Sequence, residues 1–188
     1  MFTSKLISIF ELVNNWLKFA EAKNVIILSL SGIIITIVST YIKTTANISM
    51  SIYIGLIIVV SLLFISLLIC FLSFLPKIDI EHFVWLKSKP SKKSKFILKD
   101  TDNFYFFNDL KKYQPDTLLN SMNRLYFDNQ VQIPYRKEDL DIANQIIINS
   151  EITSIKLILF RIALWHLICS IITIPFSLII SILLHSKS

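Results

Sequence analysis

The chain has 188 residues, of which 54% are hydrophobic and 17% are charged, with a formal net charge of +6. Soluble domains are about 45 to 50% apolar and about 25% charged, so an ordinary soluble globule is not expected. Two glycines and five prolines are too few for a collagen-like or Gly/Pro-rich disordered chain, and 14 phenylalanines argue against intrinsic disorder.

The first 24 residues predict an amphipathic helix. Apolar side chains recur at helical steps from Leu6 through Phe10 and Val13 to Leu17. Charged residues interrupt the stretch, which is not the pattern of a cleaved signal peptide. No proline or glycine separates it from the apolar run that follows. The sequence therefore allows one long helix projecting from a membrane, or a helix lying on the membrane surface.

Three apolar runs follow, at residues 25–43, 54–75 and 157–184. A helix rises about 1.5 Å per residue and a bilayer core is about 30 Å thick, so about 20 apolar residues are enough to cross it. The predicted fold class is an all-α membrane protein with three transmembrane helices and a cytoplasmic helical module, residues 76–156, between the second and the third. In the first span, Gly32 and nearby serines are the small residues through which membrane helices approach each other.

The distribution of basic residues predicts the orientation. Residues 76–156 hold 13 of the 19 lysines and arginines, and the first 24 residues hold Lys5, Lys18 and Lys23. The 44–53 connection holds none. Cytoplasmic segments of membrane proteins collect positive charge. We therefore expect a multi-pass protein of the bacterial inner membrane with its N-terminus in the cytoplasm.

The segment between the second and third runs predicts several helices. Lysines gather from Lys87 to Lys99, with Phe96 as the one aromatic residue among them, which favours anionic lipid or solvent over nucleic acid. Pro115 and Asp116 predict a helix start, and residues 126–135 a loop. From Lys137 a continuous helix is predicted to run into the third span.

Polar residues follow one face of this last helix at Gln145, Asn149, Thr153 and Lys156. Amides can read the edge of a nucleobase, and a lysine supplies a point charge for phosphate, so the set suits a ligand with a base and a phosphate. The alternative is that the amides make interhelical hydrogen bonds or face water, while Lys156 extends its ammonium to the membrane interface.

Three stretches of the chain, in order, resemble the Pycsar membrane effectors, the cyclic-pyrimidine-activated antiviral proteins of bacteria. They are EAKNVIILSLSGIII at 21–35, NFYFFNDLKKYQPDTLLNSM at 103–122 and IANQIIINSEITSIK at 142–156. The chain departs from the family pattern at Glu21, at Asn108 and Asp109, and at Asn144, where an arginine is usual.

The resemblance implies an antiviral defence effector. It would sense a cyclic pyrimidine mononucleotide, cyclic UMP or cyclic CMP, made by a partner cyclase. It would then impair the inner membrane and cause abortive infection, with a homo-oligomer in the bilayer as the expected assembly. Chemistry combined with the motif matches gives a predicted ligand-binding set: Lys23, Phe106, Phe107, Gln145, Asn149 and Lys156.

Two other classes of function remain at this stage. A constitutive membrane scaffold or accessory subunit would use the cytoplasmic helices for docking and bind no nucleotide. An enzyme is not expected, because His82, His166 and His185 lie apart in the sequence and no Gly-rich phosphate loop is present. No metal site and no cofactor are predicted either.

Overall fold

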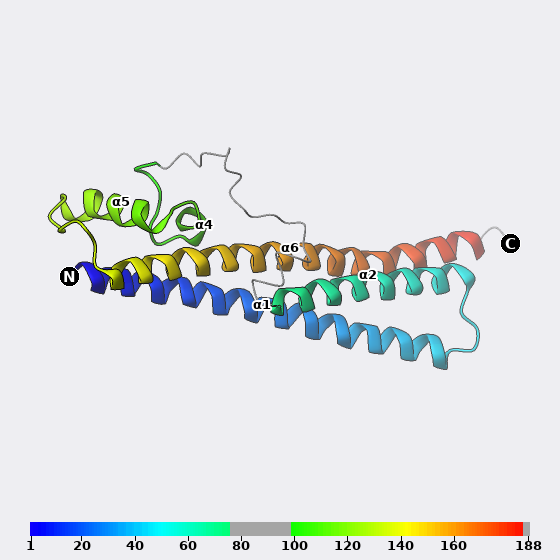
Figure 1. Cartoon of the computed structure of the whole chain (residues 1–188). Helices are drawn as coiled ribbons and strands as arrows, with labels where there is room; N and C mark the ends of the chain where they lie inside the picture. Colours follow the sequence, from blue (N-terminus) through cyan, green and yellow to red (C-terminus); the bar gives the residue numbers. More distant parts are fainter. Residues whose placement is uncertain (76–98, 186–188) are drawn as a thin grey trace. The chain divides into compact units, whose positions relative to one another are not determined.

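The structure is a computed structural model that describes residues 1–75 and 99–185. Every regular element in these ranges is a helix, which confirms the predicted fold class (Figure 1). The predicted lysine-rich stretch from Lys87 to Lys95 lies outside the described residues. The helices are α1 (Phe2–Thr44), α2 (Met50–Phe74), α4 (Phe107–Leu110), α5 (Pro115–Phe127) and α6 (Lys137–His185).

The three long helices, α1, α2 and α6, are each long and apolar enough to cross a membrane. The continuous helix predicted from Lys137 is confirmed by α6. The connection between α1 and α2 is shorter than the predicted 44–53, because the Ser49 carbonyl already accepts the Tyr53 N–H at 3.0 Å. At the other end of α2, Leu75 is extended (φ −65°, ψ 145°), as the proline that follows it in the sequence favours.

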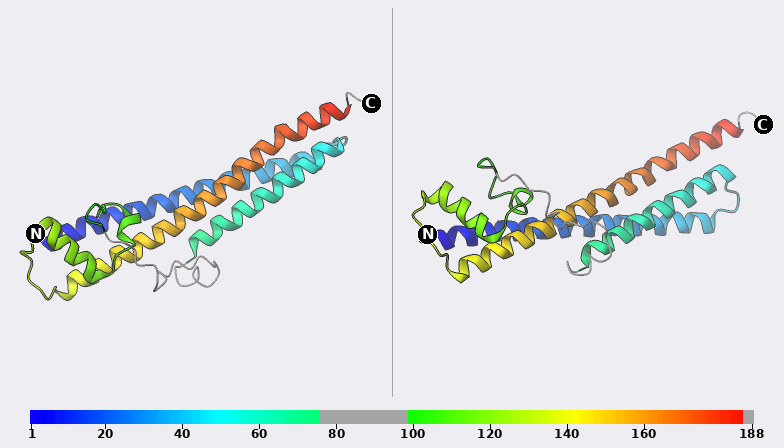
Figure 2. Two further views of the ribbon diagram at one scale, coloured as in Figure 1. Left: turned by 90° about the horizontal axis from the view of Figure 1, so that it is seen from above. Right: turned by 45° about the horizontal axis from the view of Figure 1, so that its top comes forward.

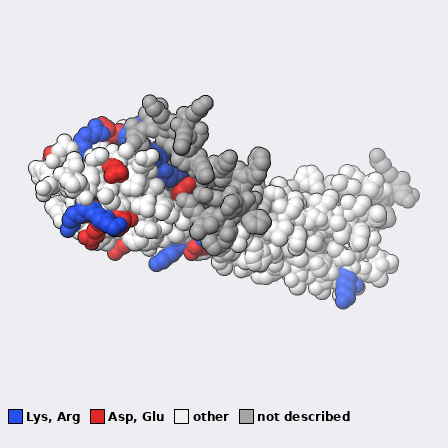
Figure 3. Space-filling model, in the orientation of Figure 1, with Lys and Arg blue, Asp and Glu red and all other residues white. Residues whose placement is uncertain are grey.

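The chain divides into two compact units. The first combines Met1–Ala20 with Pro76–Leu157, and the second combines Glu21–Leu75 with Ile158–Ser188. Since α1 and α6 are each one helix, each contributes residues to both units. The charged atoms visible in Figure 3 lie mostly over the first unit. This division places a charged module and an apolar membrane segment on the same two helices.

The core of the first unit is built on the predicted amphipathic stripe. The residues of this helix that reach the core are Phe2, Leu6, Ile9 and Val13, which are all less than a tenth exposed and follow steps of four, three and four residues. Of the predicted stripe, Leu6 and Val13 are thus buried, whereas Phe10 and Leu17 are half-buried. The four buried residues pack with α5 and with the first turns of α6, and the turned views in Figure 2 show these segments alongside one another. In the first unit the stripe is thus covered by protein. The buried partners are Phe104, Leu110, Tyr113, Leu118, Leu119, Met122, Ala143 and Ile146.

Local chemistry explains where α5 begins and ends. Pro115 occupies the first helical position, where its missing N–H costs nothing, and the Thr117 hydroxyl accepts the Gln114 N–H at 2.9 Å. The helix ends at Asp128 in the left-handed region (φ 49°). These contacts confirm the predicted helix start, and α5 extends two residues into the loop predicted at 126–135.

The second unit is held together by small residues as well as apolar packing. The Ser31 hydroxyl donates to Ser66 Oγ at 3.4 Å, and the Ser66 hydroxyl donates to the Ala163 carbonyl at 2.9 Å. At Gly55, an added Cβ would lie 2.4 Å from Ser177 Cβ, so α2 and α6 approach closely there. Of the small residues predicted to mediate helix approach in the first span, Ser31 makes such a contact, whereas an added Cβ at Gly32 would meet nothing within 4 Å in the chain.

Candidate functional site

The predicted polar face of α6 divides into exposed and buried positions in the first unit. Gln145 is exposed, whereas Lys156 is only 7% exposed. Between them, the Asn149 side-chain amide donates to Asn14 Oδ1 on α1 at 2.7 Å, and the Thr153 hydroxyl donates to the Asn149 carbonyl at 2.7 Å. An interhelical hydrogen bond thus occupies the amide of Asn149, and Gln145 is the member of this face most open to a ligand.

The two predicted phenylalanines lie at the start of the short helix α4: Phe106 directly precedes it and Phe107 is its first residue. Phe106 is 38% exposed, while Phe107 is buried and its ring centroid lies 5.7 Å from that of Trp16 on α1. The two phenylalanine centroids are 4.8 Å apart. Phe107 therefore anchors α4 to α1, and Phe106 is the ring that remains available at the surface.

The last predicted site residue, Lys23, belongs to the second unit, whereas the other five belong to the first. Its ammonium lies 5.2 Å from the centroid of the Phe160 ring, in the same unit. That arrangement is a cation–π contact. The six predicted residues are thus distributed over both units, and of these six Phe106 and Phe107 are in side-chain contact with each other.

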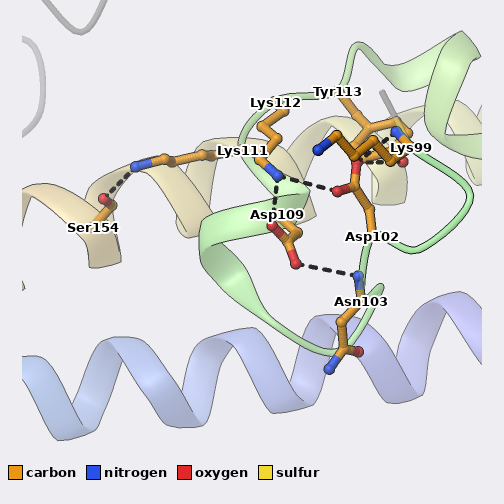
Figure 4. Close-up of polar contacts among 8 residues, drawn as sticks. All are labelled: Lys99, Asp102, Asn103, Asp109, Lys111, Lys112, Tyr113 and Ser154. Atoms are coloured by element: carbon orange, nitrogen blue, oxygen red, sulfur yellow. Dashed lines mark hydrogen bonds and ion pairs between the residues drawn. The ribbon is translucent and has the colours of Figure 1, made fainter. Parts of the chain in front are cut away.

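A polar cluster fixes the aromatic segment that leads into α4 (Figure 4). The Asp102 carboxylate accepts the Lys112 ammonium at 3.1 Å, the Tyr113 hydroxyl at 3.1 Å and the Lys99 backbone N–H at 3.1 Å. Lys112 also donates to Asp109 at 2.6 Å. Burial opposes ionisation of Asp102, but these donors prevail and lower its pKa. The cluster therefore holds a charged carboxylate inside the module.

The same segment is tied to α6 through Lys111. The Lys111 ammonium donates to Ser154 Oγ at 2.8 Å, and Ser154 is itself buried (Figure 4). Burial lowers the pKa of Lys111, and the nearby charge of Glu151 acts in the opposite direction. A contact between α4 and the stretch of α6 just before the third span is thus built into the module.

We expect Asp102→Asn to reduce the free energy of unfolding by about 1.5–3 kcal/mol, the usual contribution of hydrogen bonds to a charged group. Because the pKa of Asp102 is lowered in the folded protein, its stabilisation is present above about pH 3.9 and is lost as pH falls through the folded value. As the pH is lowered, the melting temperature of the variant should therefore fall less steeply than that of the wild type.

Asp100→Asn is the matched control for this carboxylate. Asp100 pairs with Arg124, but both side chains are more than half exposed, so the loss should stay below about 1 kcal/mol. Equal losses in the two variants would contradict a special role for the Asp102 cluster.

A hollow of about 660 Å³ in the first unit was not predicted from the sequence. It is bordered by the first turns of α1, the end of α5 and the residue Tyr105. Lys5 is the one charged side chain among the described residues that line it. Its cationic and aromatic members come from segments about 100 and 20 residues apart, so no local motif could have indicated it. They are Lys5, Tyr105, Tyr126 and Phe127. The remaining lining residues are Met1, Ser4, Ser8 and Leu125.

Comparison with known families agrees with this architecture. Residues 5–184 match the model of the Pycsar effector protein domain, PycTM, so the match covers nearly the whole chain, including all three long helices. No curated protein and no solved structure matches the chain.

Proposed function

Since this chain belongs to the Pycsar effector family of antiphage membrane proteins, we propose that cyclic UMP or cyclic CMP activates it to impair the inner membrane. The observation that carries the proposal is the family match over residues 5–184, which includes the three candidate membrane spans. Membership makes the chain a membrane protein of a non-catalytic effector family, and implies a cyclic nucleotide signal from a cyclase.

Helix continuity supports a route from ligand to membrane. Helices α1 and α6 each carry residues of the charged module and of the apolar segment, so a shift in the module moves spanning residues of the same helix. A ligand changes this equilibrium only if it binds the active arrangement more tightly than the resting one. Assembly into a homo-oligomer, with the ligand favouring one packing of the subunits, would supply such a difference.

The test is a membrane-potential assay on liposomes that contain the full chain. We expect dye loss on addition of cyclic UMP or cyclic CMP, and none with cyclic AMP or with the linear monophosphates. A constitutive scaffold, the competing function, would leave the potential unchanged with every nucleotide and would bind none of them.

The proposed orientation places the first unit in the cytoplasm, because that unit holds most of the lysines and arginines. In a chain lacking Cys70 and Cys169, we expect a cysteine at exposed Gln130 to react with an impermeant maleimide only after cells are permeabilised. A cysteine at exposed Asn47, between α1 and α2, should react in intact cells. The reverse labelling pattern would show that the protein is inserted the other way round.

A further inference from the structure

The hollow at the end of α5 places a cation against two aromatic rings. The Lys5 ammonium on α1 lies 4.9 Å from the centroid of the Tyr105 ring and 5.8 Å from that of Tyr126. A hydrogen bond with the Tyr105 side chain raises the pKa of Lys5, so the ammonium is charged at neutral pH. No acidic residue is found among the described residues that line the hollow, so an anion would meet no repulsion from its walls.

The Tyr126 ring is suited to act as a stacking platform. It is 45% exposed, yet its centroid lies 5.5 Å from that of Phe104, an almost fully buried ring of the core, in an edge-to-face arrangement. The Phe104 contact thus holds the tyrosine in place while much of its surface remains open. A base that stacks on a fixed ring binds with a more favourable free energy than one that stacks on a mobile ring, because less conformational freedom is lost on binding.

The size and chemistry of the hollow fit a small ligand that has both an aromatic ring and a negative charge. Its volume of about 660 Å³ lies within the range of about 300–1,000 Å³ that small-molecule sites occupy. An exposed cation–π contact is weaker than a charge-assisted hydrogen bond to phosphate, so a phosphate can draw Lys5 away from the rings. The hydroxyls of Ser4 and Ser8 line the same hollow. The Ser4 hydroxyl donates its proton to the Met1 carbonyl at 2.7 Å, so a phosphate could receive that proton only if this bond were exchanged.

We propose that this hollow is the nucleotide site, with the pyrimidine stacked on Tyr126 and the cyclic phosphate bound by Lys5. The proposal rests on the function proposed above and gives that function a location. It differs from the predicted set, because none of Lys23, Phe106, Phe107, Gln145, Asn149 and Lys156 lines the hollow.

A ligand in this position joins three separate segments of the first unit. It contacts α1 through Lys5, the stretch before α4 through Tyr105, and the last turn of α5 through Tyr126. Closing the hollow around the ligand would draw these segments together. Because α1 continues as one helix to Thr44, the same closure acts on a helix that enters the apolar segment.

Calorimetry on the full chain in nanodiscs tests the site, with cyclic UMP and cyclic CMP as ligands and uridine as a probe without phosphate. We expect Lys5→Gln to weaken cyclic nucleotide binding about ten- to hundredfold. Uridine should bind wild type and Lys5→Gln equally. Tyr126→Ala should weaken the nucleotide and uridine alike, while Lys5→Arg and Tyr126→Phe should retain binding.

Two control variants match these changes elsewhere in the first unit. Lys137→Gln removes an exposed lysine that pairs with Asp141, and Gln145→Ala removes the most open residue of the α6 polar face. Both should bind as wild type. The melting temperature of each variant is measured alongside. If Lys5→Arg and Tyr126→Phe retain binding, the weaker binding of Lys5→Gln and Tyr126→Ala is due to the lost charge and the lost ring, not to misfolding.

The outcomes separate this proposal from the function on which it rests. If wild type binds a cyclic pyrimidine nucleotide and both Lys5→Gln and Tyr126→Ala bind it equally well, the hollow is not the site and the proposed function stands. A loss confined to Gln145→Ala would place the ligand on α6. If wild type binds neither nucleotide and the membrane potential is unaffected, both proposals fail.

Discussion

Inserting two glycines after Ser150 is expected to abolish nucleotide-induced membrane depolarisation while leaving nucleotide binding intact. The insertion rotates the two halves of α6 by about 200° relative to one another and costs about 1 kcal/mol for each glycine. It also separates the Asn149 contact with α1 from the Lys111 contact with Ser154. Binding should survive because no residue of α6 lines the hollow. Liposome dye loss and calorimetry on the same preparation measure the two effects.

The control is the same insertion after Asn47, in the connection between α1 and α2. That connection is not helical, so no helix register changes and depolarisation should persist. Undiminished depolarisation by the Ser150 insertion would rule out rigid transmission along α6. The signal would then pass along α1 alone, or the ligand would act by clustering, in which the modules assemble first and the spans follow.

The second large effect is expected at Gly55, where Gly55→Ala should destabilise the protein by about 1–3 kcal/mol. The added methyl group would lie 2.4 Å from Ser177 Cβ, closer than any real contact, so α2 and α6 would have to move apart. Elsewhere in a helix, the same substitution stabilises by about 1 kcal/mol, because glycine is the poorer helix former. Thermal unfolding in detergent therefore shows whether the substitution raises or lowers the stability of the protein, and by how much.

Gly32→Ala provides the matched control on another span. With nothing within 4 Å of an added Cβ, it should leave the melting temperature unchanged or raise it. Adding Ser177→Gly to Gly55→Ala removes the atom that clashes and should restore stability. If Gly55→Ala and Gly32→Ala destabilise the protein alike, the change in stability comes from helix propensity or backbone effects and not from the α2–α6 contact.

Helix existence could be predicted from the sequence because it depends on local composition. Apolar runs of about 20 residues, an amphipathic stripe and a proline at a helix start each identify an element without knowledge of its partners. The three long helices and the start of α5 follow from these signals. The sequence placed the start of α2 later than the structure does. Apolar composition does not show that the first helical hydrogen bond forms between the Tyr53 N–H and the Ser49 carbonyl.

Contacts between elements could not be predicted in the same way. Gly32 and Gly55 look equivalent in the sequence, and only the packing of α2 against Ser177 distinguishes them. The sequence left open whether Asn149 binds ligand or makes an interhelical hydrogen bond, but it did not indicate the partner, Asn14, which lies 135 positions away. Lys5, Tyr105 and Tyr126 come together only after the helices pack, so no spacing rule relates them.

The composition of the first unit also determines the order in which the chain can assemble during synthesis. Its core joins Phe2, Leu6, Ile9 and Val13 with Ala143 and Ile146, so the ribosome must add about 130 further residues before the stripe on α1 is fully covered. At about 5–20 residues per second, that interval is roughly 7–27 s. The membrane segments before residue 76 are synthesised within it. A nascent chain therefore carries an uncovered apolar helix beside the membrane for several seconds, a period in which chaperones or the bilayer itself must shield it.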